Sequence, residues 1–449
     1  MTTPPIAAVV LAAGKGTRMK SDLHKVLHPI AGQPMLLHLL ASVDALAPAR
    51  KVVVVGSGRD QLEAALGDIA TLAVQEPQLG TGHAVQQAEG ALAGFDGDVL
   101  ILYGDVPLVP TATMQRMLDR LHAPDAPAIV VLGFEPDDTL RYGRVIAQGD
   151  RIVKMVEHKD ATDAERAVRL CNSGLMAARS ADLFALLARV GNDNAASEYY
   201  LVDIVNIAND DGRLSAVVTT DPFEVAGVNS RAELAALERE WQARRRAQAM
   251  ADGATLIAPE TVWFAHDTVL GRDVVIEPNV FFGPGVRVAD RATIRANCHI
   301  EGSAIAPGCE VGPFARLRPG TVLGEGAKIG NFVETKKAVL GAGAKANHLT
   351  YLGDAEVGAK ANVGAGTITC NYDGFFKYKT VIGESAFIGS NSALVAPVTV
   401  GTGAIVGAGS VITADVAPDA LALARGTQAA KPGWAKRFRE LMTAKKNAR

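Results

Sequence analysis

From Ile276 onward, large apolar residues recur at every sixth position, a spacing that fits neither an α-helix nor an ordinary β-strand. Most of them are followed by Gly or by a small or acidic residue, and most have a small residue four positions later. The residues in register are Ile276, Phe282, Val288, Ile294 and Ile300, then Val311, Leu317, Leu323 and Ile329, then Ile382, Ile388, Leu394, Val400, Val406 and Ile412. Such a repeat predicts a parallel β-helix, in which each coil covers the apolar edge of the one before.

The first 228 residues have a different pattern, in which continuous apolar runs alternate with segments of helical spacing. The apolar runs predict β-strands at 7–11, 52–55 and 99–102, and a helix is predicted at 35–46. This alternation predicts a mainly parallel, Rossmann-like α/β sheet. Ligands bind outside the carboxyl ends of the strands in such sheets, so we expect a site in the loops after the first and third of these runs.

A single helix is predicted between the two halves, over 229–252, with Leu234, Leu237 and Trp241 on one face. At 1.5 Å per residue it would be about 35 Å long. We therefore predict an α/β domain at 1–228, a helical linker at 229–252 and a β-helix domain with a C-terminal tail at 253–449. The β-helix itself is expected over about 255–417, and a final helix over 433–446.

The six-residue register slips at three places, near Ile305, over 335–340 and over 369–379. A purely structural rod has no need of such slips, whereas loops carried on rigid scaffolds are where binding groups are placed. The middle of the β-helix is therefore a second candidate site.

Composition narrows the class of protein further. The chain has 449 residues, of which 48% are hydrophobic, and its net charge of -3 argues against a nucleic-acid-binding protein. The N-terminal apolar run at 6–13 is too short to span a bilayer and follows no basic segment, so it predicts a buried strand. The four cysteines are scattered without metal-binding spacing, as expected for reduced thiols in the cytoplasm. We expect neither a membrane nor a nucleic acid as a partner.

A glycine-rich loop, LAAGKGTRM at 11–19, follows the first predicted strand. Its two glycines allow backbone N–H groups to approach phosphate oxygens. The loop lacks the third glycine of a dinucleotide-binding motif, because Met19 takes that place, and no G-K-[ST] closes it as in a Walker loop. Lys15, Arg18 and Lys25 supply cations that suit displacement at the phosphorus of a polyphosphate.

This loop and the KVL at 25–27 resemble those of the sugar-nucleotide pyrophosphorylases. Joined to a hexapeptide rod, they resemble the bifunctional family of N-acetylglucosamine-1-phosphate uridyltransferases and glucosamine-1-phosphate N-acetyltransferases. Further segments recur in the family's order, namely QEPQLGTGH at 75–83, YGDVP at 103–107, YGR at 142–144, VEHK at 156–159 and GVN at 227–229. The resemblance also implies a left-handed β-helix, a hand that the residues alone do not determine.

The resemblance implies a catalytic role on the phosphates for Arg18 and Lys25. The residues that it implies for UTP and UDP-N-acetylglucosamine are Leu11, Ala12, Gly14, Lys25, Gln75, Gln78, Gly80, Thr81, Tyr103, Gly104, Asp105, Gly143, Glu157, Asn172 and Asn229. The chain departs from the family pattern at Val202, where Thr is usual, and at His24, where Pro is usual. The first change removes a possible hydroxyl contact to the sugar.

Asp105 ends an apolar strand at a glycine turn, where a carboxylate is costly to bury unless it binds something. Mg²⁺ prefers a few protein oxygens together with water and substrate phosphates, so Asp105 and the amide oxygen of Asn229 would suffice as ligands. The simpler interpretation is that Asp105 caps the turn. No general base is expected, because a sugar 1-phosphate is already ionised at neutral pH and attacks the α-phosphorus of UTP directly.

The irregular middle of the rod contains His348 among clustered cations. The resemblance makes His348 the general base that deprotonates the amine of glucosamine, a role typically worth about 10² to 10⁴ in rate. The residues implied for glucosamine phosphate are Arg318, Lys336, Tyr351, Asn362 and Lys377. Those implied for acetyl-CoA are Ala365, Asn371, Tyr372, Ser390, Ala408 and Arg425. Cys370 suggests a covalent nucleophile as an alternative, but a thioester already reacts readily with an amine.

The resemblance implies two reactions. The β-helix would form N-acetylglucosamine 1-phosphate and CoA from acetyl-CoA and glucosamine 1-phosphate, and the α/β domain would join that product to UTP, releasing pyrophosphate. The segment 369–379 is long for a β-helix corner, and the resemblance implies that it reaches a neighbouring rod in a homotrimer. Two alternatives stay open, a pyrophosphorylase whose rod serves only assembly or regulation, and a non-catalytic scaffold.

Overall fold

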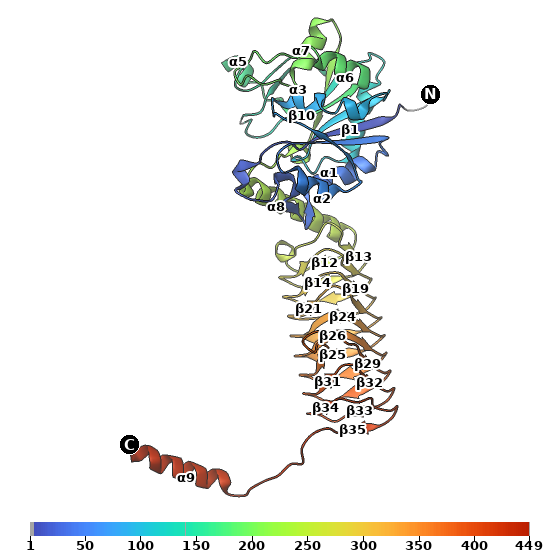
Figure 1. The fold of residues 1–449 in the computed structure, drawn as a ribbon, viewed down its shortest axis with the longest axis vertical. Helices are drawn as coiled ribbons and strands as arrows, with labels where there is room; N and C mark the ends of the chain where they lie inside the picture. Colours follow the sequence, from blue (N-terminus) through green and yellow to red (C-terminus); the bar gives the residue numbers. More distant parts are fainter. Residues whose placement is uncertain (1–3, 140, 449) are drawn as a thin grey trace. The chain divides into compact units, whose positions relative to one another are not determined.

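The computed structural model describes residues 4–139 and 141–448, and its contacts divide the chain into two compact units, Met1–Ala243 and Arg244–Arg449 (Figure 1). The boundary falls inside α8 (Arg231–Ala251), which occupies most of the predicted 229–252 helix. The finer division into domains at 1–228 and 253–449 stays a prediction. In the described part of the chain, no helix combines the length and the apolar composition needed to cross a bilayer.

The first unit is built on a nine-stranded mixed sheet with the order β5-β4-β1-β6-β10-β7-β11-β9-β8. The predicted runs form β1 (Ile6–Leu11), β4 (Arg50–Val55) and β6 (Asp98–Tyr103), which are parallel. The other strands are β5 (Thr71–Val74), β7 (Ile129–Phe134), β8 (Arg144–Gln148), β9 (Arg151–Val156), β10 (Cys171–Arg179) and β11 (Ser215–Thr220). The sheet is less uniformly parallel than the sequence pattern suggests, because β10 runs antiparallel to both of its neighbours, β6 and β7.

Helices cover both faces of this sheet (Figure 1). Alternate residues of β1 enter different cores, Ala7 and Val9 on one face, Ala8 and Val10 on the other. Burial on both faces explains why the central strands have continuous apolar sequences. The helices are α1 (Met35–Asp44), α2 (Arg59–Leu66), α3 (Thr81–Gln86), α4 (Thr111–Leu121), α5 (Asp163–Arg166), α6 (Ser180–Leu187) and α7 (Asp203–Asp210).

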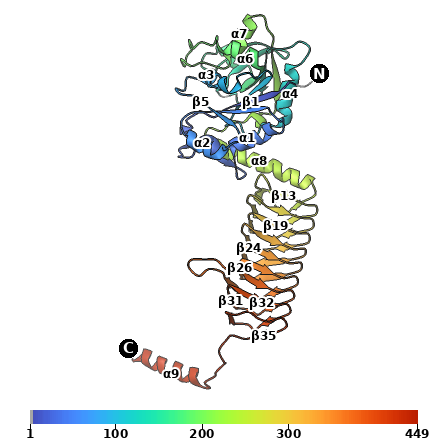
Figure 2. The ribbon, with the colours of Figure 1, turned by 45° about the vertical axis from the view of Figure 1, so that its right-hand side comes forward.

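The second unit is a left-handed parallel β-helix of hexapeptide repeats, which confirms the predicted fold class (Figure 2). One of its sheets contains β12 (Thr255–Leu256), β14 (Val275–Ile276), β17 (Thr293–Ile294), β20 (Glu310–Val311), β23 (Lys328–Asn331), β25 (Lys345–His348), β27 (Asn362–Val363), β30 (Phe387–Ile388), β33 (Ile405–Val406) and β35 (Leu421–Ala422). The other contains β13 (Val269–Leu270), β15 (Phe281–Phe282), β16 (Arg287–Val288), β18 (His299–Ile300), β19 (Ser303–Ile305), β21 (Arg316–Leu317), β22 (Thr321–Leu323), β24 (Glu334–Leu340), β26 (Tyr351–Val357), β28 (Ile368–Cys370), β29 (Thr380–Ile382), β31 (Ala393–Val395), β32 (Val398–Val400) and β34 (Val411–Ile412).

The residues of the six-residue register are all buried. Where the register is kept, residues 18 apart pair between successive coils, as Val275 does with Thr293. At the predicted slip near Ile305 the spacing falls to 17, because Val288 pairs with Ile305. After the second predicted slip, paired residues of successive coils are again 17 apart. Across 369–379 the separation of paired residues rises to 25, which identifies that segment as an insertion.

One further slip lies inside β26, where Leu352 and Val357 are both buried although they are five residues apart. The sequence analysis did not find this slip, because small residues such as Ala346 take the place of some of the large aliphatic residues that define the six-residue register. Beyond the last coil, α9 (Trp434–Asn447) forms near the predicted 433–446.

The two halves of α8 belong to different units, and each half has contacts within its own unit. Glu238 accepts a hydrogen bond from the backbone N–H of Ala31 at 2.7 Å, within the first unit. Arg246 is buried and donates to the carbonyl oxygen of Val262 at 3.1 Å, at the start of the β-helix. The exposed end of a solenoid needs such a cover, because its first coil has no preceding coil to pack on.

Candidate functional sites

A cavity of about 380 Å³ opens at the carboxyl ends of β1 and β6. The predicted residues that line it are Leu11, Ala12, Gly14, Lys25, Gln75, Gln78, Gly80, Thr81, Tyr103 and Asp105. The two strands are neighbours in the sheet, and the N–H of Gly104 donates to the carbonyl oxygen of Leu11 at 2.9 Å, which joins their ends. Glu198 also lines the cavity, and the sequence analysis did not name it as a site residue.

Lys25 connects the two residues predicted to bind magnesium. Its Nζ donates to Asp105 Oδ2 in a short ion pair and to Asn229 Oδ1 at 3.2 Å. The backbone N–H of Val228 donates to the carbonyl oxygen of Asp105 at 2.9 Å, which holds the chain before Asn229 in place. Within 4–139 and 141–448, no cluster of three or more His, Cys, Asp or Glu side chains could hold a metal ion. A metal bound by Asp105 and Asn229 would therefore complete its coordination with substrate oxygens and water.

The loop after β5 is held in place by its glutamine side chains. Gln75 Nε2 donates to the carbonyl oxygen of Gly80 at 2.9 Å, and the Gln78 amide donates to the carbonyl oxygen of Ala13. Gly80 has φ 118°, and a Cβ there would lie 2.6 Å from the carbonyl oxygen of Tyr199. Only glycine fits this position, so the loop passes close to the backbone at Tyr199.

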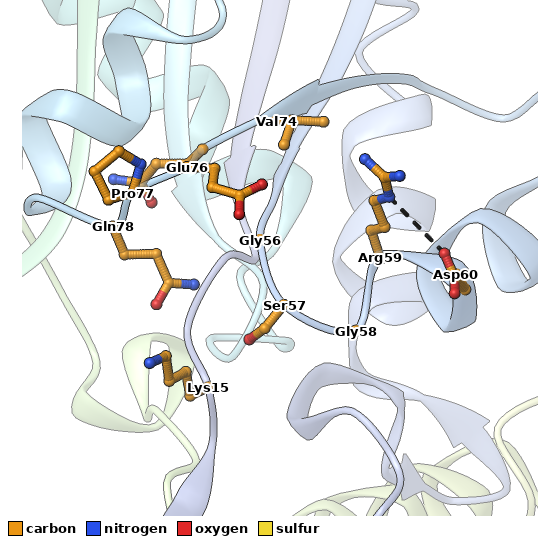
Figure 3. A pocket seen from close by; sticks show the side chains of 11 residues that line it. Lys15, Gly56, Ser57, Gly58, Arg59, Asp60, Val74, Glu76, Pro77 and Gln78 are labelled. Atoms are coloured by element: carbon orange, nitrogen blue, oxygen red, sulfur yellow. Dashed lines mark ion pairs between the residues drawn. The ribbon is translucent and has the colours of Figure 1, made fainter.

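A second cavity, of about 750 Å³, shares Gln75 and Gln78 with the first. Figure 3 shows it between the loop after β4 and the loop after β5, with Lys15 below Gln78 in this view. The absence of a side chain at Gly56 makes room for Gln78, because a Cβ there would overlap the Gln78 amide. The sequence analysis did not predict this cavity, since the segment at 56–59 matches no nucleotide-binding motif.

Three of the residues predicted for the sugar lie together outside the lining of these cavities. A Cβ on Gly143 would lie 3.4 Å from Glu157 Oε2, and the N–H of Asn172 donates to the carbonyl oxygen of Gly143 at 2.9 Å. Burial raises the pKa of the Glu157 carboxyl, and Asp203 and Asp160 raise it further by charge repulsion. These two acids were not predicted from the sequence.

Tyr103 links the first cavity to Glu157. Burial is the main cause of the raised pKa of its hydroxyl, and the Glu157 charge adds to the shift. The ring packs against Gly174, which has φ 87° and where a Cβ would lie 2.7 Å from the ring. Tyr103 therefore stays protonated at neutral pH and can donate a hydrogen bond to a ligand.

Arg18 and the two departures from the family pattern lie apart from the cavity lining. Arg18 lies on the 3-10 helix η1 (Thr17–Met19) and is exposed. Val202 is buried in the core that contains Val9, so its side chain does not face the cavity. His24 is buried too, and burial is the main cause of its lowered pKa, with Lys25 adding to it.

In the β-helix, one corner aligns the predicted base with predicted acetyl-CoA residues. This corner repeats in successive coils at Asn331, His348, Ala365, Ser390 and Ala408. In each case the residue after one member donates its N–H to the carbonyl oxygen of the member one coil earlier, at 2.7 to 3.3 Å. Arg425 continues the line, since its Nη1 donates to the carbonyl oxygen of Ala408 at 2.7 Å.

The imidazole of His348 is exposed at this corner, and its Nδ1 lies 2.7 Å from Asn331 Oδ1. The backbone is also held, because Thr350 Oγ1 donates to the carbonyl oxygen of His348 at 2.8 Å. Asn331 was not predicted from the sequence. Its spacing of 17 from His348, which is one coil, is the signal that could have identified it.

Three of the cations predicted for the β-helix lie close to one another. The adjacent Lys377 is the main cause of the lowered pKa of Lys336, and Arg318 lowers it further. Arg318 Nη1 also donates to Glu334 Oε1 at 2.9 Å, a contact that was not predicted. Cations held this close repel one another unless an anion lies between them, so the arrangement suits a phosphate group.

The other residues predicted for this site lie on β26, β27 and the insertion. Tyr351 begins β26 and is half-buried, and Asn362 begins β27, where it pairs with Lys345. Tyr372 is exposed on the insertion, and its hydroxyl donates to the carbonyl oxygen of Gly374 at 2.6 Å.

The insertion at 369–379 contains a turn that is stabilised by hydrogen bonds between its own residues. Asn371 Nδ2 donates to Asp354 Oδ2 at 2.5 Å, and Asp373 Oδ1 accepts the N–H groups of Phe375 and Phe376, each at 2.7 Å. The turn presents both phenylalanine side chains to solvent, 85% and 67% exposed.

Comparison with known proteins decides the family. The family model for MobA-like NTP transferase domains matches residues 8–250, and the model for the bacterial transferase hexapeptide (six repeats) matches 267–302 and 379–414. The bifunctional protein GlmU of Sphingopyxis alaskensis is 77% identical over 444 residues, which cover 99% of this chain and 98% of that protein. The chain belongs to the bifunctional GlmU family.

Two further GlmU proteins are similarly close. That of Novosphingobium aromaticivorans is 71% identical over 443 residues, covering 98% of each chain, and that of Rhizorhabdus wittichii is 69% identical over 451 residues, covering 100% of each. Membership of the GlmU family confirms the predicted function. The chain is a bifunctional transferase whose nucleotidyltransferase and hexapeptide acetyltransferase domains make UDP-N-acetylglucosamine in two steps, with a nucleotide and acetyl-CoA among its substrates.

Proposed function

We propose that the cavity at the ends of β1 and β6 binds UTP and N-acetylglucosamine 1-phosphate, and that Asp105 and Asn229 hold Mg²⁺ there. The observation that supports this most directly is the shared contact of Asp105 Oδ2 and Asn229 Oδ1 with Lys25 Nζ. Two hard oxygen ligands therefore face one cation position, as magnesium binding requires. When bound, the metal would neutralise phosphate charge during the displacement at phosphorus.

The side chains of the first unit bind and orient the two substrates. The uracil and ribose lie against Leu11, Ala12, Gly14, Gln75, Gln78, Gly80 and Thr81, and the sugar lies against Gly143, Glu157, Asn172 and Asn229. Lys25 and Arg18 place positive charge on the phosphates, Lys25 by exchanging its contacts with Asp105 and Asn229 for phosphate oxygens. No residue acts as a general base, because the attacking sugar phosphate is already ionised.

Acetyl transfer takes place at the β-helix corner. The amine nitrogen of glucosamine 1-phosphate attacks the thioester carbonyl while His348 takes a proton from the amine. The C–S bond then breaks, and His348 returns that proton to the sulfur so that CoA leaves as the thiol. Arg318, Lys336 and Lys377 hold the sugar phosphate, with Tyr351 and Asn362 beside it. The line of Ala365, Ser390, Ala408 and Arg425, joined by Asn371 and Tyr372, binds acetyl-CoA. The alignment of this line with His348 along one edge of the coils supports the assignment.

The active form is a cytoplasmic homotrimer, in which the insertion at 369–379 contacts a neighbouring β-helix. The exposure of Phe375 and Phe376 on an internally held turn supports this contact, because two large apolar side chains gain free energy on burial. Light scattering during size-exclusion chromatography tests the assembly, and a mass of one chain would contradict it.

Two variants test the assignment of the two sites. Asp105→Ala should abolish magnesium-dependent release of pyrophosphate and leave the release of CoA thiol from acetyl-CoA intact. His348→Ala should do the reverse. Loss of both activities in either variant, with both proteins folded by circular dichroism, would count against separate sites.

A further inference from the structure

The hydrogen bond between His348 and Asn331 determines which ring nitrogen carries the proton. Asn331 Oδ1 lies 2.7 Å from His348 Nδ1, and a carboxamide oxygen can only accept a hydrogen bond. Nδ1 must therefore be protonated in the neutral ring. Nε2 is then the unprotonated nitrogen, and it alone can accept a proton from a substrate.

The backbone on both sides of the pair is held by hydrogen bonds between coils. Asn331 and His348 occupy the same position in consecutive coils and pair directly through β23 and β25. The N–H of Leu349 donates to the carbonyl oxygen of Asn331 at 3.1 Å, and Thr350 Oγ1 and the N–H of Gly366 both donate to that of His348. The rigid coil therefore sets the separation of the two side chains.

We propose that Asn331 is a positioning residue for acetyl transfer, which holds the His348 ring and its tautomer so that Nε2 faces the amine of the sugar. The proposal rests on the proposed role of His348 as the general base. The amide is suited to the task because it orients the ring without placing a negative charge beside it. A carboxylate at the same place would stabilise the imidazolium and raise the pKa of the ring.

The ionisable groups on the strands packed against His348 have partners of their own in most cases. They are Lys328 on β23, Lys345 on β25, and Tyr351, Asp354 and Glu356 on β26. Lys328 bonds to Glu310, Asp354 to Asn371 and Glu356 to Lys379. These three groups keep their partners when residue 331 alone is changed, so a change in the titration of His348 in an Asn331 variant is assigned to residue 331.

The test uses the full-length protein with Asn331→Ala and Asn331→Asp, and Asn297→Asp as a control that adds a carboxylate at a corner of an earlier coil. The ¹⁵N signals of His348, assigned by their loss in His348→Ala, report its tautomer and its titration. The pH dependence of acetyl transfer is measured in parallel, with pyrophosphate release as a check that the first unit is unaffected.

We expect Asn331→Ala to shift the ring towards the Nε2–H tautomer and to lower kcat about 10- to 100-fold, with little change in the KM for glucosamine 1-phosphate. Asn331→Asp keeps the shape of the side chain and so remains informative if the alanine variant does not fold. It should retain the tautomer and move the acidic limb of the kcat/KM profile upward by about one pH unit. Asn297→Asp should change neither the tautomer of His348 nor the pH profile of acetyl transfer.

An unchanged tautomer in Asn331→Ala, or an unshifted profile in Asn331→Asp, would overturn the proposal. If the tautomer changes but acetyl transfer does not, His348 is not the base, and the role proposed for it fails together with the role of Asn331. The spectroscopic and kinetic readouts thus separate a failure of ring positioning from a failure of the proposed chemistry.

Discussion

Lys25 and Asp105 form an ion pair at the end of the central sheet, although they are 80 residues apart in sequence. The side chains of both are largely buried, 12% and 18% exposed. Burying two charges is costly and is offset only when they are well paired, so removing either partner leaves the other charge uncompensated. The pair therefore keeps both charged groups ready in the cavity before a substrate arrives.

Asp105→Asn should raise the magnesium concentration that gives half-maximal pyrophosphate release by at least about tenfold, because an amide oxygen is a weaker ligand than a carboxylate for this ion. A magnesium titration of both activities measures the effect. Asp44→Asn, which disrupts the ion pair with Lys51 outside the site, is the control. An unchanged magnesium requirement in Asp105→Asn would remove Asp105 from the metal site.

Gly56→Ala should weaken UTP binding, because the added Cβ would overlap the Gln78 amide and lie 2.8 Å from the carbonyl oxygen of Ala13. Gln78 must then leave its place between the two cavities, and we expect the KM for UTP to rise about tenfold, close to 1.4 kcal/mol. Steady-state kinetics measure it. Gly90→Ala, where a Cβ meets nothing within 4 Å, should leave the KM unchanged. Equal effects of the two substitutions would contradict a role for Gln78.

Glu157→Gln should stabilise the first unit at pH 7.5 but not at pH 4. Burial raises the pKa of Glu157 in the folded protein, so its ionised form is disfavoured by folding. Below the unfolded pKa both states are protonated and the substitution changes little. As the pH rises through the folded pKa, wild type loses stability that the variant keeps. Melting temperatures at the two pH values test this, with the exposed Glu89→Gln as the control.

Leu317→Ala should destabilise the β-helix by about 2–5 kcal/mol, because Leu317 is fully buried and truncation leaves a cavity. Val322→Ala, one strand further on and 43% exposed, should cost less than about 1 kcal/mol. Urea denaturation followed by loss of acetyl transfer measures both. Pyrophosphate release should survive at urea concentrations where the Leu317 variant has lost acetyl transfer, since the two units have separate cores. Simultaneous loss would contradict this independence.

The sequence by itself determined the β-helix and most of the first cavity. The six-residue register identifies Ile276, Leu317 and Ile412 as buried because each coil repeats the same local geometry, so the pattern is readable without any distant contact. The loop at 11–19 and Asp105 come together for a similar reason. They follow parallel strands that are neighbours in the sheet, and the carboxyl ends of such strands meet at one edge.

Only the tertiary structure decided which side chains touch across coils and loops. The contact of Asn331 with His348 depends on a coil of 17 residues, and the extra slip between Leu352 and Val357 is hidden where small residues replace large ones. A side chain at position 56 would overlap Gln78. This close approach depends on the paths of two loops, which no local sequence pattern specifies. Periodicity reports the repeating backbone, whereas these contacts depend on the three-dimensional positions of residues far apart in sequence, which a pattern of hydrophobic positions does not encode.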